Sequence, residues 1–194
     1  MFYIKDSEFI RENGIPMTKE EVRMLSISKM ELEEASRVLD VGAGTGSISI
    51  QAARECVSGE VVAIEKEKDA VELIEMNMKK FNVKNLNIIE GEAIKVKDSV
   101  KGEFDAVFIG GSGGNIEDII REYSLKLKCN GKIVLNFITL DNLYKAMSIL
   151  RKLCYDVECI QVGISRVRQD TYMMTANNSV FILSGRKTGG NKHE

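Results

Sequence analysis

The stretch from residue 38 to residue 46, Val-Leu-Asp-Val-Gly-Ala-Gly-Thr-Gly, constrains the fold more than any other part of the sequence. Its apolar run breaks into three glycines at alternate positions, and helical spacing then resumes with Ile48, Ala52 and Cys56. This order predicts a strand, a glycine turn and a helix. Glycine accepts positive φ and, lacking Cβ, lets a ligand lie against the backbone. The following helix directs unpaired N–H groups at the turn, so we expect a nucleotide-like cofactor there.

The spacing of the glycines narrows the kind of cofactor. Dinucleotide-binding folds carry G-x-G-x-x-G/A, and the third position of that rule falls here on Ser47. The chain reads G-x-G-x-G instead, and no Gly-Lys-Ser/Thr of a Walker-type phosphate loop follows. A glycine-rich connector without a ligand remains the alternative, because short motifs also occur by chance.

Composition limits the classes of function. The 194 residues suit one globular domain, and 27 basic and 29 acidic residues, well mixed, give a formal charge of -2. This balance argues against a protein that binds nucleic acid through bulk charge. The sequence shows no signal peptide and no apolar run long enough for a membrane span, so we expect a cytoplasmic protein without a membrane partner.

Cysteine and histidine usage bears on metals and on proton transfer. The four cysteines have no C-x-x-C pair, and the one histidine, His193, lies in the polar segment 185–194, which we expect to be a flexible tail. We therefore expect no protein metal site. Proton transfer would fall to carboxylates, Lys, Tyr, Cys or water, and the sequence identifies no catalytic residue.

Residues 1–35 are expected to form a helical cap that precedes the first strand. Thr18-x-x-Glu21 has the form of a capping box, and Val22, Leu25 and Leu32 supply an apolar side as far as about Glu33. This helix either covers one face of the sheet or places Thr18 and Lys19 near the cofactor as a lid.

Two further loops follow predicted strands and would meet the same edge of the sheet. The run from Glu60 to Glu65 ends in a carboxylate about twenty residues beyond the glycines, where an acidic residue is expected to accept ribose hydroxyls. The third strand, Leu86 to Glu90, ends at Gly91-Glu92-Ala93. Glu92 could accept the adenine amine and Ala93 could offer its N–H. The alternatives are a solvated charge at a strand end for Glu65 and an ordinary turn for Gly91-Glu92-Ala93.

The rest of the chain completes an α/β pattern. Apolar runs from Phe104 to Ile109 and from Gly131 to Phe137 alternate with helical segments, which predicts a doubly wound, mostly parallel sheet with its ligands at the strand carboxyl ends. The segments 157–167 and 179–184 are strand-like and are joined without a helix, which predicts an antiparallel hairpin at the sheet edge. We expect one domain over residues 1–194.

These features together resemble the class I S-adenosylmethionine-dependent methyltransferases over residues 36–185, whose Rossmann-like sheet has seven strands and a C-terminal antiparallel hairpin. Two more stretches, Gly-Ile-Pro-Met-Thr-Lys-Glu-Glu-Val-Arg at 14–23 and Phe-Ile-Gly-Gly-Ser-Gly-Gly at 108–114, are similar to the decarboxylating cobalt-precorrin C15-methyltransferases. That family implies methylation at C15 of a cobalt-corrinoid of the cobalt-precorrin-6B type, with loss of the C12 acetate carboxyl as carbon dioxide, in anaerobic cobalamin biosynthesis. It also implies a homo-oligomer, a tetramer.

The resemblance also implies a set of site residues. S-adenosylmethionine would be bound by Thr18, Gly42, Ala43, Gly44, Thr45, Gly46, Glu65 and Ala93, to which the loop argument adds Glu92. The macrocycle would meet the small residues Gly110, Gly111, Ser112, Gly113 and Gly114, whose backbone N–H groups could receive carboxylates. Arg166 and Arg168 are candidates for other carboxylate side arms, or else lie in a solvated hairpin tip or an oligomer contact.

Three alternatives stay open. A class I methyltransferase acting on protein or RNA would share every cofactor residue, although the chain lacks the Asn/Asp-Pro-Pro-aromatic motif of amino-group methyltransferases. A non-catalytic S-adenosylmethionine-binding protein would also keep the glycine turn. A dinucleotide oxidoreductase is disfavoured by Ser47.

Overall fold

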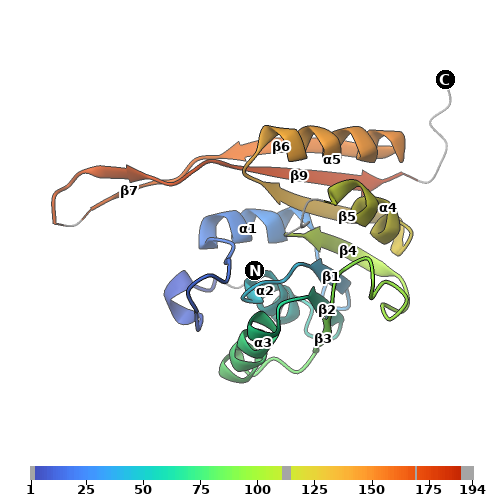
Figure 1. The fold of residues 1–194 in the computed structure, drawn as a ribbon, viewed down its shortest axis with the longest axis horizontal. Helices are drawn as coiled ribbons and strands as arrows, with labels where there is room; N and C mark the ends of the chain where they lie inside the picture. Colours follow the sequence, from blue (N-terminus) through green and yellow to red (C-terminus); the bar gives the residue numbers. More distant parts are fainter. Residues whose placement is uncertain (1–2, 111–114, 169, 189–194) are drawn as a thin grey trace.

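The computed structural model describes residues 3–110, 115–168 and 170–188, which form a seven-stranded sheet with helices on both faces (Figure 1). The strand order is β3-β2-β1-β4-β5-β9-β6; neighbours from β3 to β5 pair in parallel, whereas β9 is antiparallel to both β5 and β6. This architecture confirms the predicted fold class. The strands are β1 (Arg37–Val41), β2 (Glu60–Glu65), β3 (Leu86–Glu90), β4 (Phe104–Ile109), β5 (Leu127–Phe137), β6 (Tyr155–Val162) and β9 (Val180–Lys187).

Each face of the sheet buries its own apolar cluster, because successive strand residues point to opposite faces. Leu39 and Val41 of β1 belong to the cluster beneath α4 and α5, whereas Val38 belongs to the cluster beneath α1, α2 and α3. The sheet is therefore covered on both sides. The helices are α1 (Glu20–Lys29), α2 (Ser47–Glu55), α3 (Lys68–Phe81), α4 (Ile116–Ser124) and α5 (Leu140–Lys152), with a short 3-10 helix η1 (Asp6–Glu8).

No helix in the described ranges is long and apolar enough to cross a bilayer.

The C-terminal hairpin lies at the sheet edge, as predicted, but differs from the prediction in its details. Its strand β9 pairs with β5, and β6 is the outermost strand. The segment 157–167 is also divided: β6 ends at Val162, and β7 (Ser165–Val167) pairs with β8 (Met174–Ala176) in a separate ribbon that projects from the body (Figure 1). Finally, residues 185–187 belong to β9 and not to the expected tail. Gly185 pairs with Ile133 and Val157, and a Cβ there would lie 3.1 Å from both Ile133 and Tyr155.

The N-terminal helix is shorter than predicted and begins differently. Its N-cap is Lys19, without a side-chain capping bond, so the capping box expected at Thr18 and Glu21 does not form. Helix α1 ends at Lys29, and Leu25, expected on its buried side, is 39% exposed. The buried side contains Arg23 instead, a residue that periodicity alone assigns to the surface.

Arg23 is fully buried and ties the N-terminal segment to the rest of the domain. Its Nε donates to Gln51 Oε1 of α2 at 2.8 Å, and its Nη1 donates to Asp6 Oδ1 at 3.1 Å and to the Thr18 carbonyl at 2.7 Å. Its Nη2 donates to the Ile4 carbonyl at 2.5 Å, and its guanidinium lies 4.8 Å from the centre of the Phe9 ring. One side chain thus fixes the path of the chain that precedes α1.

We expect Arg23→Met to lower the free energy of unfolding by about 3 to 5 kcal/mol, because it leaves the buried acceptors without their donor. Urea denaturation measures the change. Arg23→Lys, which keeps the charge but not the fork of donors, should recover only part of the loss. A loss below about 1 kcal/mol for Arg23→Met would contradict the assigned role.

Candidate functional site

The glycine turn links β1 to α2, as predicted, and its backbone needs glycine. Gly42, Gly44 and Gly46 have φ values of 77°, 55° and 74°. A Cβ on Gly44 would lie 2.6 Å from the Pro16 carbonyl oxygen, and one on Gly46 would lie 3.0 Å from Ile74. Positive φ and close neighbours together exclude larger residues at both positions. Gly46 is the N-cap of α2 and has no side chain to cap the helix. The unpaired N–H groups at the start of α2 therefore face the glycine turn.

The Glu65 carboxylate at the end of β2 binds this turn directly. Its Oε2 accepts the Gly44 N–H at 2.8 Å, and its Oε1 accepts the N–H groups of Lys66 at 2.7 Å and Glu67 at 3.0 Å. Because each carboxylate oxygen can accept about two hydrogen bonds, Oε2 keeps room for one further donor, such as a hydroxyl. The structure thus brings together Gly44 and Glu65, which are 21 positions apart in the sequence.

The segment before α1 lies against the other side of the turn. The Thr45 N–H donates to the Pro16 carbonyl at 3.3 Å, and the Thr18 carbonyl is held by Arg23. Thr18 is half-buried and lies two residues beyond this contact. The segment that contains Thr18 therefore lies against the glycine turn, and α1 covers the sheet; the lid role of Thr18 and Lys19 stays a prediction.

A second buried carboxylate, Asp40 of β1, adds negative charge beneath the turn. The Ser49 hydroxyl donates to Asp40 Oδ2 at 2.5 Å, whereas Oδ1 and the nearby Thr45 Oγ1 are buried without partners among the described residues. Burial raises the pKa of Asp40 to about 7; the Ser49 hydrogen bond opposes the rise, and the charge of Glu65 adds to it. A cationic ligand near the turn would relieve this repulsion. Sequence reasoning assigned no role to Asp40, although its place at the end of an apolar run was a usable signal.

The loop after β3 begins beside Glu65, because the Gly91 N–H donates to the Glu65 carbonyl at 2.8 Å. Glu92 is paired with Lys95, whose ammonium holds the pKa of this carboxyl below its usual range. The Ala93 carbonyl accepts the Tyr123 hydroxyl at 2.6 Å, which fixes the loop to α4. The loop therefore lies at the expected edge of the sheet, but the Glu92 carboxylate already has a partner in Lys95.

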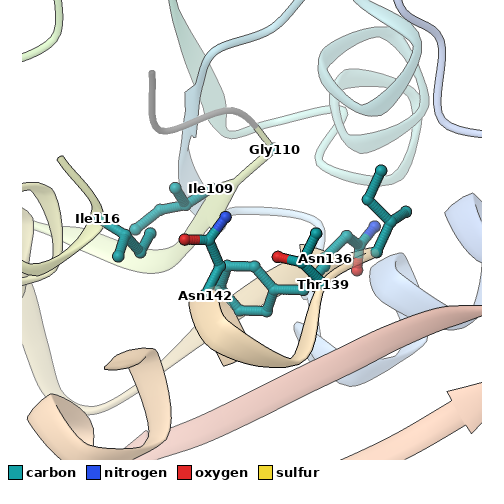
Figure 2. A pocket seen from close by; sticks show the side chains of 8 residues that line it. Ile109, Gly110, Ile116, Asn136, Thr139 and Asn142 are labelled. Carbon is teal, nitrogen blue, oxygen red and sulfur yellow. The ribbon is translucent and has the colours of Figure 1, made fainter. Parts of the chain in front are cut away.

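Gly110 connects the glycine turn to a cavity at the ends of β4 and β5. Its N–H donates to the Val41 carbonyl at 3.0 Å, and a Cβ there would lie 3.3 Å from the Gly42 carbonyl oxygen and 2.9 Å from the Phe108 ring. The adjoining cavity has a volume of about 180 Å³. Its lining, shown in Figure 2, consists of Ile109, Gly110, Ile116, Asn136, Phe137, Ile138, Thr139 and Asn142.

The remaining substrate predictions have different outcomes. Gly111, Ser112, Gly113 and Gly114 lie outside the described residues. Sequence reasoning missed the polar residues Asn136, Thr139 and Asn142; their position just after the strand at Gly131–Phe137 was the available signal, because ligands gather at strand carboxyl ends.

Arg166 extends from β7 to the start of α1, where its Nη2 binds Glu20 Oε1 at 3.2 Å and also Glu21. Its guanidinium is thus already engaged by two carboxylates. Arg168 lies in the exposed turn between β7 and β8, where its N–H donates to the Met173 carbonyl at 2.8 Å. A substrate-binding role for either arginine stays a prediction.

We expect the Asp40 carboxyl to make the ligand-free fold less stable as pH rises. Its folded pKa of about 7 lies above the ordinary 3.8. Between these values the folded chain holds a proton that the unfolded chain has lost, so stability falls as pH increases. The decrease in the free energy of unfolding between pH 4 and pH 8 should therefore be smaller by about 2 to 4 kcal/mol in Asp40→Asn. Urea denaturation across this pH range measures the difference. The exposed Asp156→Asn is the control, and an unchanged slope in Asp40→Asn would contradict the assignment.

Comparisons with known proteins agree with these motifs. A family model described as a precorrin methyltransferase domain matches residues 8–180. A protein of Sulfurisphaera tokodaii named probable cobalt-precorrin-6B C(15)-methyltransferase (decarboxylating) is 43% identical over 187 residues, covering 95% of this chain and 97% of its own length. The Salmonella typhimurium protein named cobalt-precorrin-6B C(15)-methyltransferase (decarboxylating) is 38% identical, covering 95% of this chain and 96% of its own length.

A solved structure gives the same result. Precorrin-6y C5,15-methyltransferase from Geobacter metallireducens superposes with a TM-score of 0.90 at 36% identity, covering 95% of this chain and 97% of that one. The family match spans the glycine turn and the residues that line the cavity beside Gly110. The chain belongs to the precorrin methyltransferase family, as its motifs predicted.

Proposed function

We propose that this protein transfers the methyl group of S-adenosylmethionine to C15 of cobalt-precorrin-6B and releases the C12 acetate carboxyl as carbon dioxide, in cobalamin biosynthesis. The observation that carries the proposal is the contact of Gly110 with Val41 and Gly42, which sets the glycine turn beside a cavity. Relatives that span the same length are named for this reaction.

The residues at the turn fit S-adenosylmethionine, which supplies a methyl group on a positively charged sulfur. Glycines 42, 44 and 46 let a ligand approach the backbone, and Oε2 of Glu65 has room for a ribose hydroxyl. Asp40 and Glu65 provide negative charge for a cationic ligand. Thr18, Ala43 and Thr45 belong to the two segments that meet at the turn, and Ala93 lies in the loop that begins beside Glu65.

Methyl transfer is an in-line displacement, so the main task of the protein is alignment. Effective molarities of about 10⁵ to 10⁸ M are available from alignment alone. The absence of a side chain on Gly110 keeps the path between the turn and the cavity open, since a Cβ would lie 3.3 Å from the Gly42 oxygen. We assign no catalytic base.

Decarboxylation follows from the charge that methylation creates. When C15 forms its bond to the methyl carbon, the conjugated ring becomes a cation. The bond between the CH₂ carbon and the carboxyl carbon of the C12 acetate then breaks. Carbon dioxide leaves, and the electron pair of that bond enters the ring. A proton gained by the remaining CH₂ carbon and a proton lost from the ring complete the balance. The cobalt belongs to the substrate in this scheme.

Incubation with methyl-labelled S-adenosylmethionine and purified cobalt-precorrin-6B tests the proposal. We expect equal amounts of methylated product and carbon dioxide. Methylated product that retains its acetate would limit the activity to methyl transfer, and no methylated product would overturn the proposal. Parallel incubations with RNA and with protein acceptors should give no labelled product.

Glu65 should contribute strongly to the affinity for S-adenosylmethionine. Glu65→Ala removes a charged acceptor, which costs about 1.5 to 3 kcal/mol. Glu65→Ala also leaves the Gly44 N–H without its acceptor. Glu65→Gln keeps an acceptor for this N–H and should therefore lose less affinity for S-adenosylmethionine. Titration calorimetry measures both, with Glu90→Gln at the end of the neighbouring β3 as the control. Unchanged affinity in Glu65→Ala would rule out the ribose contact.

The assembly and the location of the protein are further proposals. A homotetramer is supported by the projecting ribbon, whose side chains Val167, Tyr172, Met173 and Met174 are 54% to 84% exposed, since contiguous exposed apolar surface commonly marks an interface. We also propose a single domain over residues 1–194, with residues 1–35 as its cap, acting in the cytoplasm without a nucleic-acid or membrane partner.

A further inference from the structure

We propose that the cavity beside Gly110 receives the acetate side arm that loses carbon dioxide, with Asn142 and Thr139 as its hydrogen-bond donors. This inference rests on the proposed function and deepens it by assigning a place to the second reaction. The cavity volume of about 180 Å³ admits a side arm but not a macrocycle.

The position of the cavity suits this side arm. Gly110 and Ile109 line it, and Gly110 also contacts the glycine turn through Val41 and Gly42. Carbon 12 and carbon 15 belong to neighbouring parts of the ring, separated by two ring atoms. When C15 faces the methyl donor, the C12 acetate therefore lies within reach of a cavity that adjoins the turn.

The donors in the cavity are free to bind a ligand. Neither the Asn142 amide nor the Thr139 hydroxyl has a hydrogen-bond partner in the described part of the chain, and Thr139, the N-cap of α5, does not cap its helix. In Figure 2 the Asn142 side chain rises between Ile109 and Ile116 on one side and Thr139 on the other. Asn136, by contrast, is held by the Ser26 hydroxyl of α1 at 3.0 Å and forms a fixed wall.

The charges around the cavity suit a carboxylate that is to be lost as carbon dioxide. Helices α4 and α5 both begin at the cavity, through Ile116 and Thr139, so their first N–H groups favour an anion. None of the eight lining residues carries a formal charge. Asp141 in the first turn of α5 is bound to Lys145 at 2.7 Å. Neutral donors can orient a carboxylate, whereas an Arg or Lys partner would stabilise the charge that disappears when carbon dioxide forms.

The lining has one buried apolar side and one open side. Ile109, Ile116 and Phe137 are at most 7% exposed, whereas Ile138 is 72% exposed and Thr139 is also exposed. The apolar side offers no hydrogen-bond partner to a carboxylate, so the side-chain donors for the acetate are Asn142 and Thr139.

The test uses Asn142→Leu and Thr139→Val, which keep approximate size and remove the donors, with Ser148→Ala further along α5 as the control. Each full-length variant is incubated with labelled S-adenosylmethionine and cobalt-precorrin-6B, and product mass separates methylated ring with and without the acetate. We expect carbon dioxide release to fall about tenfold or more relative to methyl incorporation, so that product retaining its acetate accumulates. Calorimetry should show unchanged affinity for S-adenosylmethionine in both variants.

Two outcomes would overturn the inference. If methyl incorporation and carbon dioxide release fall by the same factor, the side chains position the whole ring; if neither falls, the acetate binds elsewhere. The same assay tests the proposed function separately. If the wild-type protein gives neither product, the proposed function itself is contradicted. Because Thr139 is exposed, Thr139→Val is expected to fold even if Asn142→Leu does not.

Discussion

The hydrogen bond from the Gly44 N–H to the Glu65 carboxylate is the contact on which the site depends. It joins the turn after β1 to the end of β2 at 2.8 Å, so two loops that are distant in the sequence have one fixed geometry. On its other side the turn is held by the Pro16 carbonyl, and the segment that contains Pro16 is in turn held by buried Arg23. The site is thus positioned from both the sheet and the N-terminal cap.

The turn also carries negative charge. Asp40 and Glu65 place two buried carboxylates at the turn, and their repulsion contributes to the raised pKa of Asp40. A positively charged methyl donor would relieve this repulsion, whereas the thioether left after transfer carries no sulfonium charge. The same electrostatics that favour binding of the donor therefore favour release of the spent product. The cavity beside Gly110 likewise has no charged lining residue that would hold the acetate as a carboxylate.

Local signals predicted much of the sheet. The bounds of β2, β3 and β4 agree with the sequence prediction because each is an apolar run that ends at a charge or a glycine. The meeting of Gly44 with Glu65 also followed from sequence, since parallel strands deliver their loops to one edge. Burial of Arg23 did not, because its partners Ile4 and Asp6 come from the N-terminal segment and its partner Gln51 comes from α2. The insertion of β9 and the cavity at Asn142 likewise depend on tertiary packing that no local pattern encodes.

A crystal structure of the protein with S-adenosylhomocysteine tests most directly whether the turn, Glu65 and the cavity form one site. We expect a ribose hydroxyl to bind Glu65 Oε2 and the sulfur to face Gly110 and the cavity that Asn142 lines. A nucleoside bound away from Glu65, or a sulfur directed away from that cavity, would contradict a single site for both reactions.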